Sequence, residues 1–144
     1  MSGAIRDTSH LIVYVADTDA TLAFYGALGG VVEGDEELAT PALDAIFGRT
    51  GVRIREAFVV IGGSRLHTIE TLDVPYSGPP REARAPGFQG ISFEVDDIEA
   101  SREKVAGAGL SPTAVFDFLE TRIPCRMFFL EDPDGNRVEM IQYV

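Results

Sequence analysis

Apolar and polar positions follow the same order in two distant stretches of the chain. Residues 10–30 begin with the β-rich run HLIVYV, pass through DTD into apolar positions at helical spacing, and stop at Gly29-Gly30. Residues 90–110 repeat this order, with GISFEV, an Asp pair, a helical pattern and Gly109. The two stretches align at a constant offset of 80 residues without a gap. The chain therefore contains an internal repeat.

Each repeat continues with segments typical of strands. After the first helix we expect strands at 31–33, 52–61 and 65–71, and a short helix at 42–47. After the second helix we expect strands at 113–118, 126–130 and 137–143, with DPDGN as the last hairpin turn. The unit is thus β-α-β-β-β, present twice.

This organisation predicts an α+β fold in one domain, residues 1–144. The Pro- and Gly-rich segment at 73–87 lacks periodicity and is interpreted as a linker. The boundaries that follow are module one at 8–72 and module two at 88–144.

The composition limits the possible partners and cellular location of the protein. The chain is 45% apolar and has a net charge of −11, which argues against nucleic acid or an anionic membrane as a partner. A single cysteine excludes an internal disulfide, and no apolar run reaches membrane-spanning length. We expect a cytoplasmic protein.

The repeat resembles the vicinal oxygen chelate superfamily, which includes glyoxalase, bleomycin-resistance and extradiol-dioxygenase relatives. The resemblance covers nearly the whole chain. It is carried by SHLIVYVADTDATLAFYGALGG, FVVIGGSRLHTIETLDVP, GISFEVDDIEASREKV and, most specifically, FFLEDPDGNRVEMIQ. It implies two tandem βαβββ modules that form a curled, U-shaped mixed sheet around a metal-binding cavity. It also implies a homodimer, because relatives of this length commonly pair.

The same resemblance assigns four metal-ligand positions, at His10, His67, Gly90 and Glu139. Three of these residues are good ligands, whereas Gly90 stands where the family usually has His. Strand parity agrees with the assignment: His10 alternates with an apolar row suited to packing under a helix, so its own face points toward the cavity. Both histidines of the chain occupy ligand positions.

Two imidazoles and one carboxylate are the facial triad that suits non-haem Fe(II) and O2. We therefore expect iron at His10, His67 and Glu139, with Mn, Co, Ni or Zn as other metals of the family. The position lost at Gly90 leaves room for a flat substrate. Gln89 or Glu70 are alternative ligands, although parity places both on the opposite face.

Other residues are candidates for secondary roles. Tyr14 shares the face of His10 and is a candidate hydrogen-bond donor to substrate, with a core aromatic as the other interpretation. Glu94 is a candidate base, with an exposed strand carboxylate as the alternative. Arg65 and Arg137 occupy matching positions and are expected to form surface ion pairs. Four phenylalanines are candidates for an aromatic wall: Phe116, Phe118, Phe128 and Phe129.

Three functions remain open at this stage. The first is a dioxygenase-type enzyme that acts on a small aromatic or quinol-like substrate with O2, in natural-product tailoring or aromatic catabolism. The second is a metal-dependent isomerase, epimerase or lyase. The third is a metal-free resistance protein that sequesters a drug. Bound metal separates the last from the others.

Overall fold

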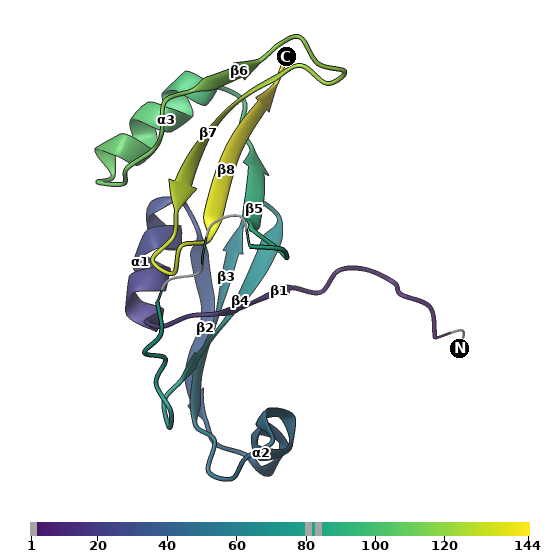
Figure 1. Cartoon of the computed structure of the whole chain (residues 1–144), viewed down its shortest axis with the longest axis vertical. Coiled ribbons are helices and arrows are strands. Elements are labelled where there is room, and N and C mark those ends of the chain that lie inside the picture. Colours follow the sequence, from purple (N-terminus) through teal and green to yellow (C-terminus); the bar gives the residue numbers. More distant parts are fainter. Residues whose placement is uncertain (1–2, 80–81, 83–84) are drawn as a thin grey trace.

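The computed structural model describes residues 3–79, 82 and 85–144 (Figure 1). Module one has the order β1 (Leu11–Tyr14), α1 (Thr18–Ala27), β2 (Val31–Leu38), α2 (Pro41–Phe47), β3 (Ile54–Ile61) and β4 (Ser64–Thr71). Module two has the order β5 (Gly90–Glu94), α3 (Ile98–Gly107), β6 (Phe116–Phe118), β7 (Cys125–Glu131) and β8 (Arg137–Tyr143). The tandem βαβββ architecture is confirmed, with α2 as an insertion in module one.

Two strands differ clearly from the expectation: β6, expected at 113–118, begins only at Phe116, and β2 is longer than expected. The pattern predicts a strand at 31–33, but β2 continues to Leu38 because it pairs with β3 from Val31 opposite Val60 to Leu38 opposite Ile54, with one register shift between Val32 and Gly34. Its sequence, VVEGDEEL, does not alternate, so cross-strand pairing decides its extent.

The strands form two separate four-stranded sheets. Sheet A has the order β1-β4-β3-β2 and sheet B the order β5-β8-β7-β6. In each sheet the first strand is parallel to the last strand of its module, and the other pairs are antiparallel. The two sheets are not closed into one, so β1 and β5 are both edge strands (Figure 1).

Equivalent residues begin the two long helices. Asp17 caps α1 by accepting from the N–H of Ala20, and Asp97 caps α3 by accepting from the N–H of Ala100. Both caps come from the Asp-containing segments that separate strand from helix in the repeat. Within the described ranges, no helix combines the length and the apolar character needed to cross a bilayer.

One core joins the modules. Helices α1 and α3 pack against their sheets, and the buried cluster includes Phe24 and Val59 from module one and Phe128 and Val138 from module two. Helix α2 packs on the other face of sheet A, where a smaller cluster surrounds Ile54. The faces of the sheets away from α1 and α3 are called the open faces below.

The β7–β8 turn of module two forms hydrogen bonds with module one. Buried Asp132 accepts a 2.9 Å hydrogen bond from the Tyr25 hydroxyl, and Asp134 accepts one of 3.1 Å from the N–H of Ala16. Burial, and then the charge of Asp132, raise the pKa of Tyr25. The expected hairpin turn is present, and it adds a polar contact between the modules to their shared core.

Candidate functional site

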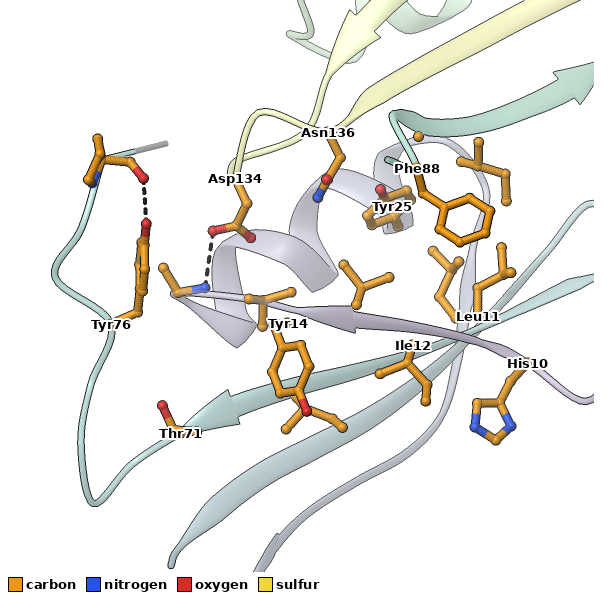
Figure 2. Close-up of a pocket in the computed structure, with 18 residues that line it drawn as sticks. His10, Leu11, Ile12, Tyr14, Tyr25, Thr71, Tyr76, Phe88, Asp134 and Asn136 are labelled. Atoms are coloured by element: carbon orange, nitrogen blue, oxygen red, sulfur yellow. Dashed lines mark hydrogen bonds between the residues drawn. The ribbon is translucent and has the colours of Figure 1, made fainter. Parts of the chain in front are cut away.

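The two histidines lie next to one another on the open face of sheet A. His10 immediately precedes β1 and His67 lies in the middle of β4, the strand that pairs with β1. Their ring centroids are 5.1 Å apart at an interplanar angle of 83°. Figure 2 shows the side chains of His10, Ile12 and Tyr14 on one side of β1, as the alternation predicts.

His67 is surrounded by side chains from β3. Its Nε2 lies 2.7 Å from Oε2 of Glu56, and its ring stacks on Phe58 with centroids 4.3 Å apart. The guanidinium of Arg65 lies over the same Phe58 ring, 4.5 Å from its centroid. Nδ1 of His67 is buried and has no hydrogen-bond partner among the described residues. The imidazole is thus held between a carboxylate and an aromatic ring.

The other candidates on this face are less enclosed. Nδ1 of His10 lies 2.9 Å from the Ser9 hydroxyl. The Tyr14 side chain is 61% exposed and meets Phe47 of α2 edge to face, at 6.3 Å. Tyr14 is therefore not a core aromatic in this chain, and its ring stands on the open face near α2.

Glu139 lies in sheet B, on β8. It accepts a 2.6 Å hydrogen bond from the Ser92 hydroxyl and is paired in register with Phe129 of β7. Glu94 is exposed, two residues beyond Ser92 on β5. Among the described residues, no group of three His, Cys, Asp or Glu side chains forms a site that could hold a metal ion. The structure brings His10 and His67 together but does not bring Glu139 to them within one chain.

Close packing of the backbone explains why position 90 carries a glycine. A Cβ atom built there would lie 1.6 Å from the backbone oxygen of Arg137 on β8, far inside the contact limit. Room for substrate therefore does not follow from Gly90, because the space beside its Cα is filled by the neighbouring strand. The backbone of β8 excludes every side chain at this position.

The two alternative ligands have structural roles. Gln89 directs its side-chain amide to the carbonyls of Ala85 and Gly87 in the linker. Glu70 accepts from the N–H and the hydroxyl of Thr18, so it holds the start of α1 on the helix side of sheet A. Glu70 thus lies on the face opposite His67, as parity predicts.

All the candidate arginines and phenylalanines except Phe128 lie on the open faces. Arg65 pairs with Glu33 at 3.3 Å, as expected, whereas Arg137 lies over the ring of Phe129, 4.7 Å from its centroid. Phe128 is fully buried and belongs to the core, which removes it from any aromatic wall. The residues that remain available on the open side of sheet B are Phe116, Phe118 and Phe129.

A cavity of about 1040 Å³ extends along β1 between the modules (Figure 2). His10, Ile12 and Tyr14 contribute to it from β1 and the residue before it, and Phe88 and Asp134 contribute from module two. Burial, and then nearby carboxylates that include Asp132, raise the pKa of Asp134, although its hydrogen bond from Ala16 opposes this shift. Most of the residues that line the cavity are apolar, and Asp134 places a carboxylate at its border.

Glu56 was not anticipated, although the sequence contains a signal for it. The two-residue turn at Gly62-Gly63 places Phe58 opposite His67, and Glu56 follows on the same face of β3. Pairing the two strands across this turn therefore places the Glu56 carboxylate near the candidate ligand His67.

The donor set fits a divalent metal in part. The imidazoles of His10 and His67 lie next to one another on one open face, and imidazole and carboxylate suit ferrous iron. Glu56 is on the same face but is bonded to Nε2 of His67 and lies opposite Ile69, so it does not complete a group with His10. The remaining carboxylate, Glu139, stands on the matching face of the other sheet.

Comparisons with known proteins agree with this fold. A glyoxalase family protein from Bacillus cereus is 16% identical, with 99% of this chain and 97% of that chain covered and a TM-score of 0.81. A glyoxalase family protein from Enterococcus faecalis is 19% identical, with coverage of 94% and 97% and a TM-score of 0.70. A glyoxylase/bleomycin resistance protein/dioxygenase domain from Frankia sp. is 17% identical, with coverage of 98% and 100% and a TM-score of 0.68.

At such low sequence identities, the similarity to these structures shows a shared fold and nothing more. No curated protein matches the chain in sequence. The family model, however, matches residues 8–140, which is nearly the whole chain. The repeat, the two βαβββ sheets and this match together place the chain in the Glyoxalase/Bleomycin resistance protein/Dioxygenase superfamily.

Proposed function

We propose that the protein is a non-haem Fe(II)-dependent oxygenase that acts on a small aromatic or quinol-like substrate with O2. One observation carries the proposal: the only two histidines of the chain lie side by side on an open sheet face, with ring centroids 5.1 Å apart. Two imidazoles with a carboxylate leave coordination positions open for substrate and O2, which is the arrangement that ferrous oxygenases use.

In this proposal His10, His67 and Glu139 hold the metal. Bound Fe(II) supplies the one-electron chemistry that reactions of O2 require. The Tyr14 hydroxyl donates a hydrogen bond to a phenolic oxygen of the substrate, and Glu94 accepts a proton from the substrate hydroxyl. The rings of exposed Phe116 and half-buried Phe129 on sheet B flank a flat substrate and exclude water.

We further propose that the working unit is a homodimer, because Glu139 does not reach the histidines of its own chain. Edge strands β1 and β5 each have one unpaired side, and such edges readily pair with another chain. Ile12 and Tyr14 on β1 are each 61% exposed. Pairing of these edges between two copies would cover the apolar side chains and bring Glu139 of the second copy toward His10 and His67.

Anaerobic calorimetric titration of metal-free protein with Fe(II) tests the metal. We expect one Fe(II) per chain in the wild type and a loss of at least about 100-fold in affinity in His67→Ala. Oxygen consumption with catechols and hydroquinones would then identify the substrate class. If Fe(II), Mn, Co, Ni and Zn all fail to bind the wild type, the oxygenase proposal is wrong.

A mixing experiment tests the shared site. His67→Ala and Glu139→Ala chains are unfolded, mixed and refolded together, so that half of the dimers contain one chain of each kind. If sites combine residues from two copies, each mixed dimer has one intact site, and about a quarter of all sites regain Fe(II) binding. If all three ligands belong to one chain, no binding returns. Each variant refolded alone is the control.

Two other functions use the same groups differently. A metal-dependent isomerase, epimerase or lyase would bind Mn, Co, Ni or Zn and turn over without consuming O2. A metal-free resistance protein is favoured by one observation, the 1040 Å³ apolar cavity bordered by Tyr76, Phe88 and Asp134, which suits a cationic planar drug. Drug binding unchanged by removal of metal would support this function.

A further inference from the structure

The cavity between the modules extends along the unpaired edge of β1. All residues from 10 to 16 line it, and Phe88 and Ile91 line it from module two. Within the part of the chain that the structure describes, β1 pairs only with β4, so this gap keeps the two sheets separate. An unpaired edge of this kind offers its N–H and C=O groups to another extended chain.

The hydrogen bonds of sheet A show which backbone groups of β1 face this gap. The N–H of Val15 donates to the carbonyl of Ile69 on β4, so alternate residues back along β1 face β4 as well. The residues between them, Ile12 and Tyr14, therefore direct their backbone groups toward the gap. The next N–H in this row, that of Ala16, donates to a carboxylate of the β7–β8 turn, which ends the unpaired edge.

The residues before β1 have the length of a strand that would fill the gap. Residues 3–9, called the N-terminal segment below, are all exposed and belong to neither helix nor strand. Figure 1 shows this part of the chain leading away from the two sheets. The segment contains Ile5, which is 97% exposed. Seven extended residues span about 23 Å, which equals the length of the stretch 10–16 along the cavity.

Two-fold symmetry lets a second copy supply this segment. The N-terminal segment runs directly into β1, so a two-fold axis at residue 9 lays the segment of each copy antiparallel along β1 of the other. This axis sets Arg6 opposite Ile12 and Ala4 opposite Tyr14. Ile12 and Tyr14 are the residues of β1 whose backbone groups face the gap, so the register matches donors with acceptors.

The same register gives Ile5 an apolar environment. Side chains opposite one another in an antiparallel pair point to the same face, so Ile5 lies beside Val13, on the face that packs on α1. Val13 and Ile91 are partly buried residues packed against the main core, and both line the cavity. Insertion of Ile5 between them removes apolar surface of both copies from water, which favours association.

We propose that the N-terminal segment of each copy occupies this cavity of a second copy, as a strand antiparallel to β1 with Ile5 against Val13. This inference rests on the proposed homodimer and specifies that the partner's N-terminal segment covers the unpaired edge of β1. A ligand of the cavity would then share the space with the partner's Ile5, so the second copy contributes to the binding site.

The first test measures dimerisation of the full chain by analytical ultracentrifugation over a range of concentrations. Ile5→Asp should raise the Kd of the dimer at least about 100-fold, because each dimer buries two Ile5 side chains and each is worth about tenfold or more. The matched control is Ile46→Asp on α2, where the side chain is 73% exposed. The control should change the Kd less than about threefold.

A second test checks the register by cross-linking. In the proposed pairing Ile5 and Val13 form a non-hydrogen-bonded pair with Cα atoms about 4.5 Å apart, which a disulfide can bridge. The double variant Ile5→Cys, Val13→Cys should therefore form a covalent dimer on oxidation, seen by non-reducing electrophoresis. The control, Ile5→Cys with Ile12→Cys, should form at least about tenfold less, because the side chain of Ile12 points to the other face.

The possible failures are distinct. A wild type that stays monomeric would contradict the proposed homodimer itself. A wild-type dimer whose Kd is unchanged by Ile5→Asp would contradict only the role of the N-terminal segment. A disulfide within one chain of the Ile5→Cys, Val13→Cys variant would mean that the segment folds back on its own β1, and would also overturn the inference.

Discussion

The two modules share one fold and present different chemistry on their open faces. At equivalent places, module one has His10 and His67 and module two has Gly90 and Glu139. Module one gathers two imidazoles and Glu56, whereas module two has a carboxylate bonded to Ser92 and a row of phenylalanines. The faces that pack on helices differ far less, because burial constrains them in the same way. Duplication therefore kept the core and allowed the open faces to diverge.

Truncation of a core ring should have the largest effect. Phe128→Ala removes a side chain that is 0% exposed, and we expect a loss of about 3–5 kcal/mol in the free energy of unfolding. Phe129→Ala, its neighbour on the open face, should cost less than about 1.5 kcal/mol, since its ring contacts only Phe116 and Arg137 among the described ring and cation–π pairs. Urea denaturation measures both. Equal losses would contradict the division into core and open faces.

A side chain at Gly90 should have the next largest effect. Gly90→Ala forces a Cβ against the backbone of Arg137, and we expect a cost of about 1–3 kcal/mol as β5 and β8 separate. Gly107→Ala in α3 is the control, because a Cβ there meets nothing within 4 Å, and it should stabilise by about 0.5–1 kcal/mol. Thermal and urea unfolding measure both variants. A harmless Gly90→Ala would mean that a side chain fits at position 90 after all.

Glu70 and Gln142 offer a direct comparison of the two helix starts. Glu70 accepts from the N–H of Thr18, and Gln142 accepts from the N–H of Ile98. Glu70→Gln should change stability by less than about 0.5 kcal/mol, whereas Glu70→Ala should cost about 1–2 kcal/mol. Both variants should keep the metal affinity of the wild type. A loss of Fe(II) binding in Glu70→Gln would restore Glu70 as a ligand.

The smallest effect concerns pH at the contact between the modules. Burial raises the pKa of Asp134, so the folded state binds its proton more tightly than the unfolded state does. Ionised Asp134 therefore lowers stability above its folded pKa, and this penalty disappears once the pH falls below about 4, the ordinary pKa of Asp. Asp134→Asn, which keeps an acceptor for Ala16, should stabilise the protein at pH 7 and have little effect at pH 3.5.

Denaturation curves at the two pH values measure this difference. Asp7→Asn, on the exposed N-terminal segment, controls for the loss of one negative charge from a chain of net charge −11. A stabilisation by Asp134→Asn that is the same at both pH values would show that its charge is not the cause.

Sequence patterns predicted the elements whose burial is periodic. The apolar rows of β1 and β5, the Asp caps and the stops at Gly29 and Gly109 all depend on local chemistry and recur 80 residues apart. The extent of β2 was missed because its residues are mostly exposed and its length depends on pairing with β3. The expected metal ligands remain a prediction. The contact between Glu56 and His67 was not predicted, because it depends on how β3 pairs with β4.

The sequence by itself determined the duplicated βαβββ order and the face on which each strand residue stands, whereas the resemblance to the superfamily supplied the candidate ligands His10, His67 and Glu139. The order and the faces follow from strand parity, helix caps and a repeat, all of which act over short distances or by copying. Tertiary structure decided that the two histidines meet, that Glu139 stands on another sheet, and that Gly90 is excluded from carrying a side chain. Those outcomes depend on how whole sheets and backbones approach one another in space, which no local pattern encodes.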